Sequence, residues 1–376
     1  MKTKYIFALA FSLLLAGAAK AQSTWYWTNK ANLLKEGRSF GVAALNEKIY
    51  VVGGYCGGHC ELATADEYDP VSDTWAHKAN MLATRYAPAA AALNGKLYAI
   101  GGVNESGNLA TVEEYDPATD TWTNKASMQQ ARFAFQAVTL GGKIYAIGGT
   151  DETVGNNDPL ASVEEYDPAS DTWSAKADMP TPRLSFGAAV LNGKIYVIGG
   201  RILNTPIPEV WEYTPGSNTW AIKAAMPTPR ETLAVVSVNG RILAMGGSAS
   251  AGGVATVEEY DPTSDTWAAK PDLPTARNEC YAVNLCTVPN TVFVFGGYND
   301  YTMIALTVSP LLNIYTAIEL EFFTQTNKVY QLQASPDLIS WTNTDSTFQG
   351  NGDYWTKLYS TRSQVRQFYR IQVITP

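Results

Sequence analysis

Three residues close to the start of the chain are of types that bind metals or form disulfides. Cys56, His59 and Cys60 stand together as CGGHC, a spacing that occurs in metal sites and in small disulfide loops. The chain has only two histidines, so a Cys/His zinc site would be incomplete, and we expect a disulfide that involves Cys56. Cys280 and Cys286 are the other candidates, and their pairing stays open. We expect no metal and no cofactor.

Arginine and glutamate recur along the chain at a spacing near 50 residues. The arginines are Arg38, Arg85, Arg132, Arg183, Arg230 and Arg277, and the glutamates, each directly before a tyrosine, are Glu67, Glu114, Glu165, Glu212 and Glu259. A buried guanidinium needs a partner, and a carboxylate is a natural bidentate one. We therefore expect a structural arginine–glutamate lattice. One arginine lacks a glutamate, so Arg38 or Arg277 is left to hold an anionic ligand group.

The elements that position these residues come from a repeat. A glycine pair ends an apolar run, as in IYVVGG and VFVFGG, and EYDP or a close copy follows, then a tryptophan. Asn192-Gly193, between SFGAAVL and KIYVIGG, is a strong hairpin signal because both turn positions need positive φ. This pattern resembles the kelch repeat, the blade of a β-propeller, over about residues 25–308. It implies an all-β fold with four-stranded blades.

The first and last units are incomplete. WTNKA stands alone at residues 27–31 and recurs inside a full unit at 122–126, whereas the last unit has no tryptophan-bearing fourth strand. We expect the N-terminal segment to supply that strand and to close a six-bladed propeller, because a blade buries its faces only between neighbours. Residues 22–308 form this propeller.

Ligand sites on a propeller lie in loops that differ between blades. Arg201 stands where other blades have Tyr, Val, Thr or Ser, and Tyr55, Tyr298 and Tyr301 add aromatic rings near the seam. Together with Arg38, Arg277 and Glu231 these are the candidate ligand-binding residues. Rings with Arg around a concave mouth suit a glycan or another extracytoplasmic protein. We predict an exported binding protein, not an enzyme, and a monomer.

An enzymatic alternative rests on two acidic residues. Glu231 and Glu279 stand where the other repeats have mostly apolar or small residues, and two carboxylates near a channel suit acid–base chemistry. The nearest such class is the kelch-type sialic acid mutarotases, and the resemblance implies a carbohydrate isomerase that uses no metal. Galactose oxidase-like enzymes need two copper-binding histidines. His77 is predicted on an outer strand, which excludes that interpretation.

The N-terminal residues read as a signal peptide. Lys2 and Lys4 precede an apolar run, and Ala19-Lys20-Ala21 is a cleavage site, so residues 1–21 are expected to be removed. The product is secreted or periplasmic, and no later segment is apolar enough to span a membrane. The formal net charge is −8, with no basic run, which excludes nucleic acid as a partner.

The composition changes near residue 309. The segments AIELEFFT, KVYQLQAS, WTNTDSTF, DYWTKLYS and QFYRIQV read as short strands separated by turns. This tail is similar to the small fibronectin-III-like modules of some exported bacterial proteins, so we expect a β-sandwich over residues 309–376. Its aromatic residues Tyr330, Trp341, Trp355 and Phe368 are expected in its core.

Overall fold

The structure is a computed structural model, and it describes two compact units. The first unit is described over residues 25–34, 38–56, 60–151, 158–285, 290–297 and 302–308. The second is described through six strands between residues 317 and 374. No helix long and apolar enough to cross a bilayer occurs in these described parts.

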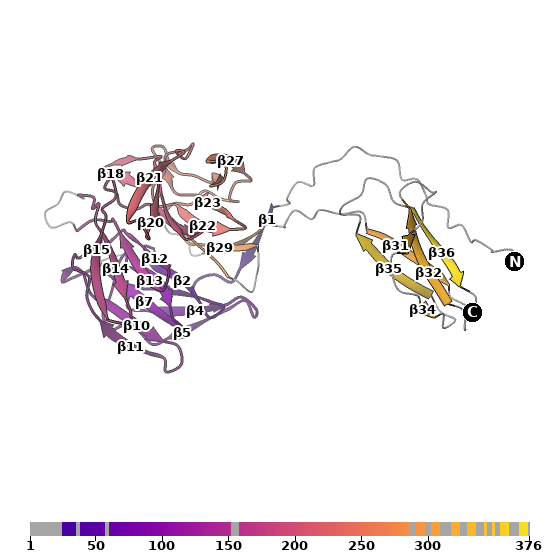
Figure 1. Ribbon diagram of the computed structural model, residues 1–376. Helices are drawn as coiled ribbons and strands as arrows, with labels where there is room; N and C mark the ends of the chain where they lie inside the picture. Colours follow the sequence, from indigo (N-terminus) through magenta and orange to yellow (C-terminus); the bar gives the residue numbers. More distant parts are fainter. Residues whose placement is uncertain are drawn as a thin grey trace. The chain divides into compact units, whose positions relative to one another are not determined.

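The first unit is a propeller of six four-stranded antiparallel sheets, numbered here as blades 1 to 6 (Figure 1). Blade 1 contains β2 (Gly41–Leu45), β3 (Lys48–Val52), β4 (Ala65–Asp69) and β5 (Thr74–Lys78). Blade 2 contains β6 (Ala89–Leu93), β7 (Lys96–Ile100), β10 (Val112–Asp116) and β11 (Thr121–Lys125). Blade 3 contains β12 (Gln136–Leu140), β13 (Lys143–Ile147), β14 (Val163–Asp167) and β15 (Thr172–Lys176).

Blades 4 to 6 continue the same order, except that the last sheet takes its outer strand from the N-terminus. Blade 4 contains β16 (Gly187–Leu191), β17 (Lys194–Ile198), β20 (Val210–Thr214) and β21 (Thr219–Lys223). Blade 5 contains β22 (Ala234–Val238), β23 (Arg241–Met245), β26 (Val257–Asp261) and β27 (Thr266–Lys270). Blade 6 contains β28 (Tyr281–Asn284), β29 (Thr291–Phe295), β30 (Met303–Val308) and β1 (Trp25–Lys30).

Short two-stranded ribbons extend three of the blades at their loops. They are β8 (Val103–Asn104) with β9 (Gly107–Asn108), β18 (Arg201–Ile202) with β19 (Thr205–Pro206), and β24 (Ser248–Ala249) with β25 (Gly252–Gly253). Each ribbon follows a glycine pair, the position at which the blades differ most in sequence.

The predicted ring closure is confirmed. β1 pairs antiparallel with β30, with Trp27 opposite Leu306, and Figure 1 shows indigo β1 against the orange strands of the C-terminal part of the propeller. The Trp27 indole Nε1 donates to the Asp272 carbonyl at 2.9 Å, as the Trp122 indole donates to the Ala79 carbonyl at 2.8 Å. The N-terminal segment therefore repeats the contacts of an ordinary fourth strand.

The glycine pairs turn the chain where backbone segments meet. Gly149 has φ +92°, and a Cβ added there would lie 2.6 Å from the Phe133 carbonyl oxygen. A non-glycine residue at this position would be strained in its backbone and would also clash. The second glycine of the pair is therefore fixed by packing between strands, whereas Gly193 of the Asn-Gly hairpin has open space around it.

The arginine–glutamate lattice exists, but the glutamates are one residue earlier than predicted. Arg85 Nη2 donates to Glu113 at 2.8 Å, and Nη1 donates to the Gly101 carbonyl at 2.7 Å. Arg132 pairs with Glu164 at 2.7 Å in the same way. Arg230 and Glu258 are the corresponding pair in blade 5, also at 2.7 Å. These arginines are fully buried, and their guanidinium groups donate to the glycine pair and the third strand of the same blade.

The predicted glutamates lie on the opposite face of the strand. Glu165 pairs with Lys176 at 3.0 Å and Glu259 with Lys270 at 2.8 Å, because successive residues of a strand point to opposite faces. Glu114 accepts a hydrogen bond from the Tyr98 hydroxyl at 2.5 Å. Tyr50 makes the same contact with Glu67. The expected pairing of these residues with arginine was wrong.

Three blades depart from the lattice. In blade 4, Trp211 occupies the carboxylate position, and Arg183 instead pairs with Glu209 at 3.0 Å. In blade 6 that position holds Ile304, and Arg277 donates to Thr302 Oγ1 at 2.6 Å. In blade 1 it holds Asp66, which contacts His77 Nδ1 at 2.5 Å on the outer strand. In blades 4 and 6 the arginine therefore pairs with a neighbouring side chain of its own blade, and in blade 1 Asp66 pairs with a histidine.

The second unit contains antiparallel strands only, within its described residues. β31 (Ala317–Phe323) pairs with β35 (Tyr354–Ser360). β32 (Val329–Ser335) pairs with β36 (Phe368–Ile374), β33 (Thr342–Asn343) and β34 (Phe348–Gln349). Trp341 lies outside the described residues. The packing of these sheets as a β-sandwich stays a prediction, as do the domain boundaries.

Candidate functional site at the mouth of the channel

The innermost strands of the six blades enclose a channel of about 780 Å³. Its wall is made by β2, β6, β12, β16, β22 and β28, which are rich in alanine and valine. Small side chains keep the strands close to the axis and leave the space open. The polar residues of this wall include Gln136, Thr139 and Asn284, whereas the charged residues that line the channel lie outside the inner strands.

A ring of residues with positive φ surrounds one end of the channel, which we call the mouth. The ring consists of Ser39, Ala87, Ala134, Ser185, Thr232 and Glu279, with φ between 49° and 55°. Hydrogen bonds between blades hold this backbone: the Ala87 N–H donates to the Ser39 carbonyl at 2.8 Å, and the Thr232 N–H donates to the Ser185 carbonyl at 2.6 Å. Left-handed backbone at non-glycine residues is uncommon and clusters at functional sites.

One side of the mouth is charged. Arg201, at the start of β18, lies with its Nε 3.2 Å from Glu231 Oε2. The angle there is not that of a hydrogen bond, so the contact is an ion pair. Glu279 of blade 6 accepts a hydrogen bond from the Ser39 hydroxyl at 2.7 Å. Thr232 Oγ1, between these groups, is buried without a hydrogen-bond partner in the described structure.

The pKa of Glu231 is raised, chiefly because burial disfavours its charged form. Arg201 opposes this effect by attraction, and Glu279 adds to it by repulsion. The side chain of Glu231 is 19% exposed and that of Arg201 is 24% exposed, so both stay accessible from the channel. Because its pKa is raised, Glu231 takes up a proton at a higher pH than an ordinary surface glutamate does.

The other side of the mouth is aromatic. Tyr86 and Phe133 line it in blades 2 and 3. Tyr86 packs against Tyr55 with ring centroids 5.5 Å apart, and the Arg38 guanidinium lies 5.4 Å from the Tyr55 ring. Around the ring, blades 2 and 3 face blades 5 and 6, so the aromatic residues stand across the channel from Glu231 and Glu279. The mouth is therefore amphipathic.

The predicted ligand-binding residues separate into four groups. Arg201 and Glu231 line the channel, and Arg38 with Tyr55 lies beside its aromatic rim. Arg277 is only 4% exposed and donates a hydrogen bond to the Gly296 carbonyl of its own blade. Tyr298 and Tyr301 lie outside the described residues. Ligand binding by these residues stays a prediction.

Arg38 does not occupy the position of the lattice arginines. Its bridge to Tyr55 matches the bridge of Tyr86 to Val103, so Arg38 occupies the position of Tyr86, one residue past that of Arg85. The sequence shows this difference in the number of residues between the arginine and the following glycine pair. The lattice arginines donate to a glycine sixteen residues on, whereas Arg38 precedes Gly53 by fifteen. Sequence reasoning also missed Ser39, Tyr86 and Tyr281, which line the mouth.

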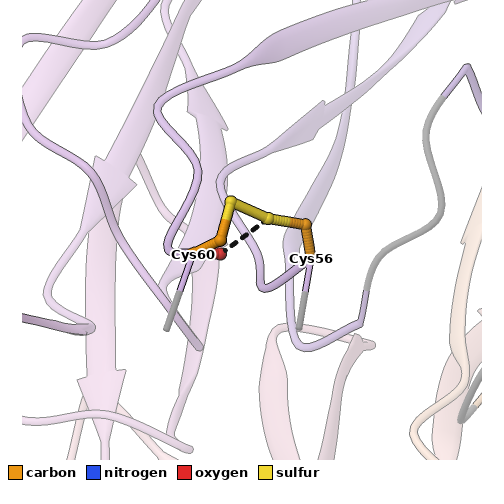
Figure 2. Close-up of a disulfide and its surroundings, with 2 residues drawn as sticks. All are labelled: Cys56 and Cys60. Carbon is orange, nitrogen blue, oxygen red and sulfur yellow. Dashed lines mark hydrogen bonds between the residues drawn. A yellow bond between two sulfur atoms is a disulfide. The ribbon is translucent and has the colours of Figure 1, made fainter. Parts of the chain in front are cut away.

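The cysteines form one disulfide within the described residues. Cys56 is bonded to Cys60 (Figure 2), which confirms a disulfide that involves Cys56. Cys280 is a buried free thiol on the channel wall, where burial raises its pKa, and Cys286 lies outside the described residues. No cluster of three metal-ligating side chains occurs in the described part of the chain.

The fold and the repeated blade contacts define a six-bladed β-propeller of the kelch type. The KLHDC2/KLHL20/DRC7 Kelch-repeats domain family matches residues 20–200 and 134–309. The chain belongs to this family.

Curated proteins match over single repeats only. The mouse (Mus musculus) influenza virus NS1A-binding protein homolog is 56% identical over 41 residues, which are 11% of this chain and 6% of that protein. Human (Homo sapiens) Kelch-like protein 28 is 49% identical over 45 residues, 12% of this chain and 8% of that protein. The chain therefore spans less than a tenth of the length of these relatives.

A solved structure supports the fold. The structure of YjhT superposes with a TM-score of 0.64 at 16% sequence identity, and the match covers 73% of this chain and 95% of that one. Identity this low shows the shared propeller architecture alone.

Proposed function

We propose that this protein is an exported binding module that recognises a glycan at the mouth of its propeller channel. The observation that supports the proposal most is the amphipathic mouth, with Glu231 and Glu279 facing Tyr86 and Phe133 across the channel and Arg201 paired with Glu231. A sugar ring presents hydroxyl groups that both donate and accept hydrogen bonds, together with an apolar face of C–H groups. Charged side chains on one wall and aromatic rings on the other fit these two properties.

Export is supported by two features. Residues 1–21 have the sequence of a signal peptide, and the Cys56–Cys60 disulfide fits an oxidising compartment such as the periplasm or the extracellular space. Residues 309–376 form a separate module in this proposal, which spaces or attaches the propeller. A second extracytoplasmic protein is the competing partner, because an open loop face also suits a protein surface.

A glycan array with the chain from residue 22 to residue 376 tests the proposal. Wild-type protein is expected to bind a restricted set of glycans, and Arg201→Met is expected to lose that binding. Arg241→Met is a matched control, because Arg241 pairs with Asp261 on the blade surface and does not line the channel. Absence of binding to every glycan would contradict the proposal.

A carbohydrate isomerase without a metal is the second candidate. It is favoured by Glu231, whose raised pKa and contact with Arg201 suit a general acid or base. Proton-NMR measurement of anomer exchange separates the candidates. An enzyme accelerates exchange of a sugar acid, and Glu231→Gln abolishes the effect, whereas a binding module leaves the exchange rate unchanged.

A further inference from the structure

The Cys56–Cys60 disulfide stands where three other blades have a backbone ribbon. The ribbon of β8 and β9 in blade 2 consists of two opposed residue pairs. In blade 1, Tyr55 bridges to Glu61 as the first such pair, and Cys56 and Cys60 form the second, with the Cys56 N–H donating to the Cys60 carbonyl at 3.0 Å. The ribbons of blades 2, 4 and 5 contain no cysteine. Backbone pairing therefore suffices for this turn elsewhere in the molecule.

The disulfide is accessible and closes a short loop. Both cysteines are exposed, so a thiol in solution can reach either sulfur. Cys60 is only four residues after Cys56, and a cross-link over so short a loop stabilises a fold least, because the loop-closure entropy that it removes from the unfolded chain grows with loop length. Exposed disulfides are the ones that take part in thiol exchange, whereas buried ones resist reduction.

The disulfide also lies next to the channel mouth. Tyr55 directly precedes Cys56, and its ring packs against Tyr86, which lines the mouth, with ring centroids 5.5 Å apart. The Tyr55 N–H donates to the Arg38 carbonyl at 2.9 Å, and the Arg38 N–H donates to the Tyr55 carbonyl at 3.1 Å. A change in the covalent closure of the loop therefore reaches the mouth through a single residue.

We propose that Cys56–Cys60 is a thiol–disulfide exchange site, and that its reduction loosens Tyr55 and weakens ligand binding at the mouth. The effect on the ligand rests on the glycan-binding function proposed above, whereas the exchange itself does not. The reductant is a small thiol or the dithiol of a redox protein.

The exchange proceeds in two steps. A thiolate of the reductant attacks one cysteine sulfur, so the S–S bond breaks, a mixed disulfide forms, and the released cysteine thiolate takes up a proton from water. A second thiolate of the reductant then attacks the reductant's own sulfur in the mixed disulfide and releases the other cysteine, which is protonated in turn. Two electrons pass to the protein, and the reductant leaves as a disulfide.

The reduced cysteines stay close enough to re-form the bond. The backbone hydrogen bond from Cys56 to Cys60 does not involve sulfur. Cys56 Sγ lies 3.1 Å from the same Cys60 carbonyl oxygen, the contact drawn as a dashed line in Figure 2, and this oxygen accepts a hydrogen bond from the thiol once the disulfide is broken. The site is therefore reversible, and its state follows the balance of thiols and disulfides around the protein.

Equilibration of residues 22–376 with mixtures of reduced and oxidised glutathione, followed by alkylation and peptide mass spectrometry, tests the exchange. Without denaturant, Cys56 and Cys60 are expected to become labelled together as the reduced share rises, while buried Cys280 stays unlabelled. Oxidised glutathione is expected to restore the disulfide. A bond that survives until the protein unfolds, or a reduced pair that does not re-form it, would overturn the proposal.

Hydrogen–deuterium exchange of the backbone amides tests the coupling to the mouth without any ligand. Reduction is expected to speed exchange in the peptides that contain Arg38 and Tyr55 and to leave the β8–β9 ribbon unchanged. The double variant Cys56→Ser/Cys60→Ser is expected to exchange as fast as the reduced protein in every glutathione mixture. Identical exchange at Arg38 and Tyr55 in the oxidised and reduced proteins would show that the coupling is absent.

Calorimetric titration with the glycan that binds best on the array measures the effect on the ligand. The reduced protein and the double variant are expected to bind about twofold to tenfold more weakly than the oxidised protein, which corresponds to the cost of ordering one loosened side chain. An affinity that does not depend on the redox state would refute control of the mouth. If no glycan binds, the proposed function fails, and the labelling and deuterium exchange still decide whether Cys56–Cys60 is an exchange site coupled to Tyr55.

Discussion

The N-terminal strand should contribute far more to stability than its length suggests. Deleting residues 23–32 removes β1 from blade 6, together with the Trp27 hydrogen bond to Asp272. It also removes Ala31, whose N–H donates to Asp73 at 2.9 Å and whose carbonyl accepts from the Trp75 indole at 3.0 Å. The deletion therefore opens blade 6 and releases its contact with blade 1.

The size of the effect follows from what is exposed. Trp25 and Trp27 pack against a cluster that contains Ile304 and Leu306, which become solvent-accessible without them. Two half-buried aromatic side chains are worth about 1.5 kcal/mol each, and the lost side-chain hydrogen bonds add about 1 kcal/mol each. The total is on the order of 5 kcal/mol, and for a domain of this size about 2 °C of melting temperature accompanies each kcal/mol.

Thermal melting of chains that begin at residue 22, with and without residues 23–32, measures the effect. We expect the deletion to lower the melting temperature by about 10 °C or to prevent folding. Tyr26→Ala is the control, because Tyr26 lies on the same strand but is 50% exposed, and it should have little effect. A deletion mutant that melts with the wild type would refute the closure of the propeller by β1.

The other predictions concern the lattice, the turns and the glycine pairs. Glu164→Gln removes the charge partner of fully buried Arg132, so urea unfolding should show a loss of about 3–5 kcal/mol, and a loss below about 1 kcal/mol would contradict the lattice. Asp120→Asn should cost little at neutral pH, because Asn218 makes the same contacts in blade 4. The pKa of Asp120 is lowered in the folded protein, so its charged form stabilises the wild type. This contribution is present above the ordinary carboxyl pKa of about 4 and is lost as the pH falls through the lowered value. The melting temperatures of the two proteins should therefore converge in acid. Gly149→Ala should destabilise the fold far more than Gly193→Ala, whose Cβ meets nothing within 4 Å; equal melting temperatures would show that the packing argument is wrong.

The closure of the ring was predictable because the signal is a whole repeated pentapeptide. WTNKA contains the tryptophan that bonds to the preceding blade and the alanine that accepts from the next. Both contacts recur around the ring, so the tryptophan recurs in every blade and the alanine four residues later in every blade but one, where Pro271 stands. The number of blades follows from this single match together with the glycine pairs.

The lattice partners were less predictable. In VEEYD two glutamates are adjacent, and the alternation of a strand sends one toward the buried arginine and the other toward a lysine. The letters alone do not say which face looks inward. In blade 4 the change from EEY to WEY removes the inner carboxylate, and that departure was the available clue.

The site was predictable in part. Arg201 and Glu231 stand out because they break the pattern of their blades, and both line the channel. Ser39 and Tyr281 gave no such signal, since serine and tyrosine are ordinary residues in loops and strands. Their role comes from the ring of left-handed backbone that turns six separate segments toward one axis, and that arrangement depends on the closed propeller.

A crystal structure of the chain with the glycan that binds best on the array tests the central claim most directly. Our account predicts the ligand in the channel mouth, with oxygen atoms within hydrogen-bond distance of Arg201 Nη1 and Nη2 and a sugar ring facing Tyr86 or Phe133. A ligand bound on the outer strands, or on the second unit with the mouth vacant, would contradict it.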